Sequence, residues 1–289
     1  MDRMLDHRYE TFLALCHIKN YTKTAALLNM TQPGVTQHIQ YYRDRTLTLT
    51  ARGQKLLAFV SRLKADSLHA MDMLSDEQTQ PPIRFGATLT IGEYMMPPII
   101  QRIYEASLDV SLSMQVGNTT TLLEQLRRGK IQFALLEGFF DRSAYDSMCL
   151  KTENFVAVCA PESPLAKGPV TLEQLLEHKL ILREQGSGTR EVLEHALARY
   201  NLTIRSFKGI TEIGNMNAIK HLVAGNLGIS FMYEVAVARE IEHNILCQIN
   251  IADFVAAHDF SFVTLKNSIH QEEYSAWFER LKQLGFASC

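Results

Sequence analysis

The 289-residue chain lacks the features that mark membrane and exported proteins. No segment approaches the roughly 18 uncharged apolar residues of a membrane-spanning helix. The charged start, M-D-R-M-L-D-H-R, lacks the apolar core of a signal peptide. We therefore expect a cytoplasmic protein with no membrane partner, and its 46% apolar residues are ample for about two folded domains.

Cysteine and the motifs of catalysis are also scarce. The ten histidines show no metal spacing, and neither G-x-S-x-G nor H-E-x-x-H occurs, so no enzyme activity, metal or cofactor is expected. The scattered cysteines have no C-x-x-C spacing, which favours reduced, buried thiols, with a redox sensor as the alternative. They are Cys16, Cys149, Cys159, Cys247 and Cys289.

The formal net charge of −2 conceals an uneven distribution. Residues 1–65 contain ten Lys and Arg but four Asp and Glu, a net charge of +6, which leaves −8 on the other 224 residues. A basic first segment on an acidic body is typical of a chain whose first segment meets phosphates.

The stretch 21–39 has the pattern of two short helices separated by a tight turn, after a first helix from about Asp6 to Lys19. Thr22 is the expected N-cap of the first helix of the pair. Thr31 is the expected N-cap of the second, with Pro33 in its first turn, where a missing N–H costs nothing.

The second helix of the pair has an inner and an outer face. Val35 and Ile39 lie four residues apart and face inward. The outer face then holds short and amide side chains that suit base edges in a major groove, namely Gly34, Thr36, Gln37 and His38. This is the layout of a helix-turn-helix reader of DNA, and the alternative is an ordinary pair of packed helices.

A short strand and a long helix follow. Residues 46–49 alternate as a strand, with Arg43 and Arg45 beside it, like the wing of a DNA-binding domain. Thr50 caps a helix of about six turns, for which we predict helix-to-helix dimerisation, with packing on the chain's own domain as the alternative. Its apolar seam consists of Leu56, Leu57, Val60, Leu63, Leu68, Met71 and Leu74.

The polar segment Asp76–Pro82, which ends in two prolines, is predicted to be a linker. After it, strands alternate with helices, which predicts an α/β body with parallel sheets and ligand sites at the strand ends. The expected strands are 83–87, 110–116, 133–136, 155–160, 180–182, 228–232 and 260–265, and the expected helices are 91–104, 121–128, 188–200, 217–224 and 274–284.

Taken in this order, the parts resemble the LysR-type transcriptional regulators over essentially the whole chain. In the first segment the resemblance rests on Phe12, Ala25, Ala26, Leu28, Thr31-Gln32-Pro33, Thr36, Gln37, Ile39 and Leu49-Thr50-x-x-Gly53. In the body it rests on Ile83-x-x-Gly86, Gly129-x-x-x-Phe133-Ala134-Leu135, Pro161-x-x-x-Leu165-Ala166 and Gly225-x-x-Gly228-Ile229.

The resemblance implies an α/β protein with an N-terminal winged helix-turn-helix at 1–50, a dimerising linker helix at 51–75 and a hinge linker at 76–82. Residues 83–289 would form an effector-binding domain like a periplasmic binding protein. Lobe I would hold about 83–154 and 259–289, and lobe II about 155–258, with crossings near Glu153 and His258. The family also implies a homodimer or homotetramer.

One departure from the family follows Gln40. By comparison with the family pattern, about a dozen residues of the recognition helix and wing are absent there, since Tyr41-Tyr42-Arg43 leads almost directly into Arg45. Either the natural chain has a shortened helix and wing, or the sequence omits a segment. The strand-like stretch 43–50 favours the omission.

The family's DNA contacts carry over onto matching positions. Base edges would be met by Gln32, Pro33, Thr36 and Gln37, and phosphates by Thr22, Lys23, Thr31 and Arg45. A two-fold dimer implies a roughly palindromic double-stranded operator. RNA polymerase is a further candidate partner.

Polar residues at successive strand ends predict an effector cleft. The candidates are Thr88, Thr90, Asn118, Thr119, Gly214 and Asn215, for which helix capping is the alternative role, and Glu137, which would gate or bond the effector or face solvent. A small anion or carboxylate is expected. The segment Arg183–Arg190 resembles that of family members tied to sulfur metabolism, which makes a sulfur oxyanion one candidate.

Two other functions compete with regulation. In a cytoplasmic small-anion-binding protein or enzyme, the α/β body would carry the function and the first segment would have no part in it. A purely architectural DNA binder would not need two hundred residues of α/β body. Stabilisation by small anions would distinguish a sensor from an architectural binder.

Overall fold

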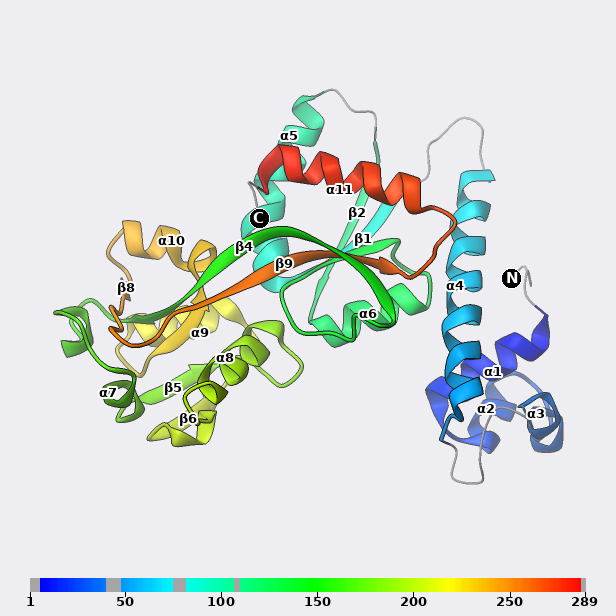
Figure 1. Ribbon diagram of the computed structural model, residues 1–289, viewed down its shortest axis with the longest axis horizontal. Helices are drawn as coiled ribbons and strands as arrows, with labels where there is room; N and C mark the ends of the chain where they lie inside the picture. Colours follow the sequence, from blue (N-terminus) through cyan, green and yellow to red (C-terminus); the bar gives the residue numbers. More distant parts are fainter. Residues whose placement is uncertain (1–5, 40–47, 75–81, 107–109, 287–289) are drawn as a thin grey trace.

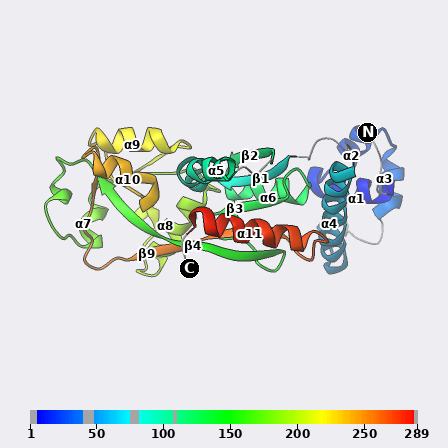
Figure 2. The same ribbon diagram turned by 90° about the horizontal axis from the view of Figure 1, so that it is seen from above.

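The computed structural model describes residues 6–39, 48–74, 82–106 and 110–286. Three parts follow one another along the longest axis, and they are a helical head, a long helix and an α/β body of two lobes (Figures 1 and 2). The head lies beside lobe I, on the side away from lobe II (Figure 1).

The head consists of α1 (His7–Ile18), α2 (Tyr21–Leu27) and α3 (Gln32–Ile39) around a small apolar core. The predicted span of about Asp6 to Lys19 is confirmed for α1, which Asp6 caps and which ends at Lys19 in the left-handed conformation. The prediction that Thr22 caps α2 is wrong. Asn20 is the N-cap, because its side chain accepts a hydrogen bond from the Lys23 N–H at 2.9 Å.

The turn into α3 follows the prediction. The Thr31 hydroxyl accepts a hydrogen bond from the Gly34 N–H at 3.3 Å, and the Thr31 carbonyl accepts one from the Val35 N–H. Val35 and Ile39 are buried against Phe12 and Leu15 of α1. The stretch 40–47, which holds Arg45, most of the predicted wing and the departure from the family pattern, lies outside the described residues.

The long helix α4 (Ala51–Leu74) begins after Thr50, whose hydroxyl accepts from the Gly53 N–H at 3.1 Å. Its first half packs on the head, where Val60 is buried. Its second half lies on lobe I, with Asp66 and His69 buried. Several apolar side chains remain exposed along α4, namely Phe59, Leu68, Met73 and Leu74.

Lobe I is built on three parallel strands, β1 (Ile83–Thr88), β2 (Leu112–Gly117) and β3 (Phe133–Leu136). The sheet continues in the order β2-β1-β3-β9-β4-β7, with the long strands β4 (Tyr145–Cys159) and β9 (Ala256–Leu265) antiparallel to their neighbours. The expectation of parallel sheets therefore holds for β1, β2 and β3, whereas β4 and β9 join the same sheet as one antiparallel ribbon.

Helices cover both faces of lobe I (Figure 1). A π-helical turn (Ile91–Met95) leads into α5 (Met96–Glu105), which packs with α11 (Gln271–Gly285) on one face, and α6 (Thr119–Arg127) covers the other. Strand alternation explains both cores. Phe133 and Leu135 belong to the core that includes Trp277, whereas Ala134 and Leu136 belong to the core that includes Leu122.

Lobe II combines four short strands with four helices. The strands are β5 (Lys179–Leu182), β6 (Gly209–Glu212), β7 (Ser230–Tyr233) and β8 (Cys247–Gln248). The helices are α7 (Leu172–Leu176), α8 (Gly188–Ala198), α9 (Met216–Ala224) and α10 (Glu234–Glu242), with 3-10 turns at Pro164–Ala166 and Ile204–Ser206. The strands β6 and β8, the helices α7 and α10, and the first half of β4 have no counterpart in the sequence-based prediction.

The ribbon of β4 and β9 passes through both lobes (Figure 1). Glu153 and His258, the predicted crossing points, are register partners in this ribbon. Glu153 is buried and accepts a hydrogen bond from the Val235 N–H at 3.2 Å. The two lobes are therefore joined by paired strands.

The structure also bears on the expectations about membrane-spanning helices and about the cysteines. Among the described residues, no helix is long and apolar enough to cross a membrane. Cys149 is disulfide-bonded, so the expectation of reduced thiols is wrong for this residue, whereas Cys159 and Cys247 are free thiols.

Candidate functional site

The outer face of α3 presents a continuous polar row. Four of the predicted base-contacting residues are exposed on it, together with the N-cap, namely Thr31, Gln32, Pro33, Thr36 and Gln37. The inner face is buried, so this row owes its position to the packing of α3 on α1. Thr22 and Lys23, the predicted phosphate contacts on α2, are also exposed.

His38 does not belong to this row, which corrects the prediction that it faces outward. Its Nδ1 lies 3.0 Å from the Thr11 hydroxyl of α1, and its ring meets that of His7 with 5.3 Å between centroids. Burial lowers the pKa of His38, with the charges of His7 and Arg8 adding to the effect. His38 is a packing residue that orients α3.

The second group of predicted residues gathers where β1 and β3 end. Thr88 closes β1, Thr90 follows it, and Glu137 follows β3, and all three are almost fully buried. Glu137 Oε1 accepts a hydrogen bond at 2.7 Å from the hydroxyl of Thr189, at the start of α8 in lobe II. The carboxyl group of Glu137 therefore links the two lobes.

Burial raises the pKa of Glu137, although the hydroxyls of Thr90 and Thr189 and the charge of Arg183 act in the opposite direction. Burial therefore favours the neutral form of this carboxyl group. The group is able to donate a hydrogen bond when neutral and to accept two when ionised.

Several buried polar atoms around Glu137 make no hydrogen bond to the described part of the chain. They are Oε2 of Glu137, Oγ1 of Thr90, Oγ1 of Thr119 and Nη1 of Arg183. An unsatisfied buried polar atom costs about 1–3 kcal/mol, so such atoms are rare in folded proteins. These atoms gather where the two lobes meet, a region termed the cleft, and they are polar groups of the kind that a small polar ligand requires.

The lobes meet closely beside this cleft. A Cβ atom built on Gly188 would lie 2.5 Å from the carbonyl oxygen of Glu137, so only glycine permits this approach. The Tyr233 hydroxyl donates to the same carbonyl oxygen at 3.4 Å. Lobe II is therefore packed directly on the end of β3.

A second contact between the lobes lies at Tyr94. Its hydroxyl donates to Oδ1 of Asn217 at 3.3 Å, and Nζ of Lys220 lies 4.3 Å from its ring centroid. Lys220 is buried and forms an ion pair with Glu240 at 2.8 Å. Burial, together with the charge of Glu93, raises the pKa of Tyr94.

The structure brings four of the seven predicted effector residues together, namely Thr88, Thr90, Thr119 and Glu137. Asn118 and Asn215 use their side chains to cap α6 and α9, accepting from Thr121 and Ala218 at 2.9 Å each. Gly214 and Asn215 are exposed.

Two cleft residues, Thr189 and Arg183, were not among the predicted contacts. Both lie in the Gly-rich segment 183–190. The resemblance of this segment to other family members assigns no role to either side chain. The sequence feature that could have indicated this contact is the hydroxyl side chain of Thr189 at the start of a predicted helix.

The α/β body of the chain identifies its family. Residues 76–285 match the family model described as the LysR substrate binding domain. The chain belongs to the LysR family. The matched range covers both lobes and the cleft between them.

Two curated relatives of this LysR-family chain are HTH-type transcriptional regulators. YeiE of Escherichia coli K12 is 33% identical over 169 residues, which are 58% of this chain and 57% of the length of YeiE. CysL of Bacillus subtilis is 24% identical over 280 residues, covering 88% of this chain and 89% of CysL.

Two solved structures share the fold. OxyR of Corynebacterium glutamicum, in its C206 mutant, has a TM-score of 0.64 at 21% identity, with 98% of this chain and 92% of that chain covered. The effector-binding domain of QuiR in complex with shikimate has a TM-score of 0.61 at 21% identity, with 71% of this chain and 99% of that domain covered.

Proposed function

We propose that this chain is a sequence-specific DNA-binding transcription regulator of the LysR type, controlled by a small-molecule effector bound between its lobes. The observation that carries the proposal is the pairing of two surfaces in one chain. One is the exposed polar row of α3, and the other is the group of unsatisfied buried polar atoms between the lobes.

For the DNA contact, we propose that Gln32, Pro33, Thr36 and Gln37 meet base edges in the major groove. The exposed positions of all four on α3 support this assignment. Thr22, Lys23 and Thr31 would anchor phosphates, and Arg45 is proposed for the same role from the family pattern alone.

For the effector, we propose a small anion or carboxylate, with sulfur oxyanions as the first candidates. Thr88, Thr90 and Thr119 offer hydroxyls, and Arg183 offers an unsatisfied guanidinium nitrogen. The neutral form of Glu137, favoured by burial, would donate a hydrogen bond to the anion without repelling it. The shikimate bound to QuiR is a carboxylate of this kind. Asn118, Gly214 and Asn215 would line the approach to the cleft.

We propose the domain boundaries that the family pattern implies, with the DNA-binding domain at 1–50, the linker helix at 51–75, the hinge at 76–82 and the effector domain at 83–289. The exposed apolar side chains of α4 support a homodimer through this helix, and two dimers would form the homotetramer. A cytoplasmic location, RNA polymerase as a partner and the absence of enzyme activity complete the proposal.

The test combines DNA selection with anion titration. Genomic fragments retained by the purified full-length chain would be sequenced, and the melting temperature would be followed while sulfite, sulfate and small carboxylates are added. We expect one recurring, roughly palindromic site and stabilisation by at least one anion. Equal retention of all fragments would contradict sequence-specific regulation, and an unchanged melting temperature with every anion would contradict the effector class.

A further inference from the structure

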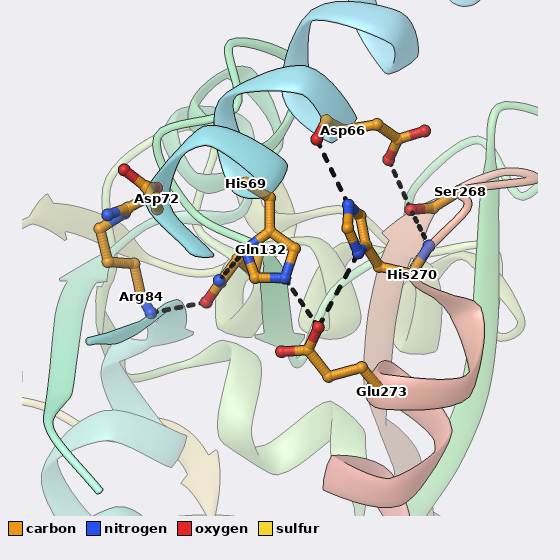
Figure 3. Close-up of polar contacts among 8 residues, drawn as sticks. All are labelled: Asp66, His69, Asp72, Arg84, Gln132, Ser268, His270 and Glu273. Carbon is orange, nitrogen blue, oxygen red and sulfur yellow. Dashed lines mark hydrogen bonds and ion pairs between the residues drawn. The ribbon is translucent and has the colours of Figure 1, made fainter. Parts of the chain in front are cut away.

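A cluster of polar side chains joins α4 to lobe I of the same chain (Figure 3). Asp66 of α4 accepts a hydrogen bond from the Ser268 hydroxyl at 2.6 Å and another from the Ile269 N–H at 3.3 Å. Asp72, two turns further along α4, forms an ion pair with Arg84 of β1. These contacts lie outside the DNA-reading helix and outside the effector cleft.

His69 lies at the centre of the cluster and is 4% exposed. Its Nε2 is 2.7 Å from Oε2 of Glu273 on α11, and its Nδ1 is 2.6 Å from Nε2 of Gln132. The amide oxygen of Gln132 accepts from the Arg84 backbone N–H at 2.8 Å, so the amide nitrogen must face His69. His69 Nδ1 is therefore the acceptor, and Nε2 carries the proton that is donated to Glu273.

The backbones of the two parts also approach closely. Gly129 has a φ of +68°, and a Cβ built on it would lie 2.8 Å from Cα of Ala65 in α4. The cavity left between them is about 10 Å³, which barely holds one water molecule. The second half of α4 is therefore in direct contact with lobe I at Gly129.

A metal ion is the other occupant that this cluster suggests. His69, His270 and Glu273 offer ligand atoms within 4.8 Å of one another. However, the proton on His69 Nε2 blocks the atom that would bind the metal, and moving it to Nδ1 would set it against the amide nitrogen of Gln132. The hydrogen bonds therefore account for this geometry better than a metal site does.

The cluster lies at the opposite end of the strands that carry the cleft. Arg84 is near the start of β1, and Thr88 is at its end. Gln132 directly precedes β3, and Glu137 directly follows it. Four or five residues of extended strand span about 13–17 Å, so two adjacent rigid strands connect the cleft with α4.

We propose that this cluster is a latch that holds α4 on its own effector domain and transmits the state of the cleft to the DNA-binding head. The first half of α4 is packed on the head, so a shift of the latch moves the head directly, without the linker. Only the final step, the effect on DNA, rests on the proposed function.

The decisive measurement is hydrogen exchange of α4 in the full-length chain with Glu273→Ala. Glu273 is partly exposed, so its replacement leaves the core intact. We expect the amides of residues 66–74 to exchange roughly tenfold faster or more, because a charge-assisted hydrogen bond to His69 is lost. Glu272→Ala is the matched control, since Glu272 is exposed in the same first turn of α11. Equal exchange in the two variants would overturn the latch.

Two further experiments test the transmission from cleft to latch and the alternative of a metal site. Thr189→Val removes the donor to Glu137 in the cleft, and an unchanged α4 exchange in this variant would refute the transmission from cleft to latch. Added zinc that slows α4 exchange in the wild type, but not in His69→Ala, would show a metal site and overturn the hydrogen-bonded latch. Operator binding is measured separately, and its absence in the wild type would contradict the regulator function alone.

Discussion

At the scale of single residues, Glu137 decides the chemistry of the cleft. It is buried between the lobes, one of its oxygens has a donor in Thr189, and the other has no partner among the described residues. Because burial raises its pKa, the native state holds a proton that the unfolded chain releases. Glu137 therefore contributes most to stability below the ordinary glutamate pKa, and this contribution is lost as the pH rises.

We predict that Glu137→Gln increases the free energy of unfolding by roughly 1–3 kcal/mol at pH 8, because the amide needs no proton to remain neutral. The difference from wild type should shrink as the pH falls toward 4.5, the usual value for a glutamate. Urea unfolding at pH 5 and pH 8 measures both. A difference that is the same at the two pH values would show that Glu137 does not titrate in this way.

At the scale of elements, the sequence predicts helix starts that depend on neighbouring residues, but it does not predict strands that depend on pairing with a distant segment. Thr31 and Thr50 cap their helices as expected, since capping depends on residues within one turn. The N-cap of α2 is Asn20 and not Thr22. The pattern of apolar positions does not locate the start of a helix to within two residues. The first half of β4 escaped notice because its partly exposed residues show no strand pattern before β9 pairs with them.

The candidate site shows the same division. Helix periodicity predicted that Thr36 and Gln37 face outward, as they do, whereas His38 turns toward Thr11. Gln32 and Pro33 were expected on this face from the family pattern. The cleft brings together Glu137 and Thr189, which are 52 residues apart, and only the closure of one lobe on the other makes them neighbours. No spacing in the sequence encodes that contact.

For α3, we predict that Gln37→Ala weakens binding to the cognate operator by roughly 1–3 kcal/mol and relaxes the preference at one base pair, since an amide pairs bidentately with adenine. Binding to a panel of single-base operator variants measures this change. Gln101→Ala on α5, an exposed glutamine of the effector domain, should leave both affinity and ranking unchanged. A Gln37→Ala chain that kept the full ranking would remove this residue from base recognition.

For α8, we predict that Gly188→Ala destabilises the chain by about 1–3 kcal/mol, because the new methyl group would collide with the carbonyl oxygen of Glu137 and force the lobes apart. Gly168→Ala is the control, since a Cβ at that position meets nothing within 4 Å. Chemical unfolding of both variants measures the effect. Equal losses in the two would mean that the lobes do not meet at Gly188 in solution.

At the scale of the whole molecule, charge and architecture agree. The excess of basic residues lies in the first 65 residues, and the other 224 residues carry a net charge of −8. The ion pairs of the latch keep the head beside lobe I, while the polar row of α3 remains exposed. An acidic body next to a basic head confines contact with a phosphate backbone to the head.

The charge distribution predicts a steep dependence of operator binding on salt. Lys23→Ala should weaken binding to all sequences about equally and reduce the slope of log affinity against log salt by about 1. Titrations at several salt concentrations measure the slope. Lys208→Ala on lobe II, which is exposed and far along the chain from the head, should not change it. A slope unaffected by Lys23→Ala would exclude that residue from phosphate contact.

The ribbon of β4 and β9 also determines the order in which the parts can fold during synthesis. The central sheet of lobe I needs β9 and α11, which emerge last from the ribosome, whereas lobe II lies almost wholly between its two crossings. The head emerges first and has its own core. A nascent chain therefore carries a folded DNA-binding head long before Glu273 is made, and control by the effector domain begins only with the final residues.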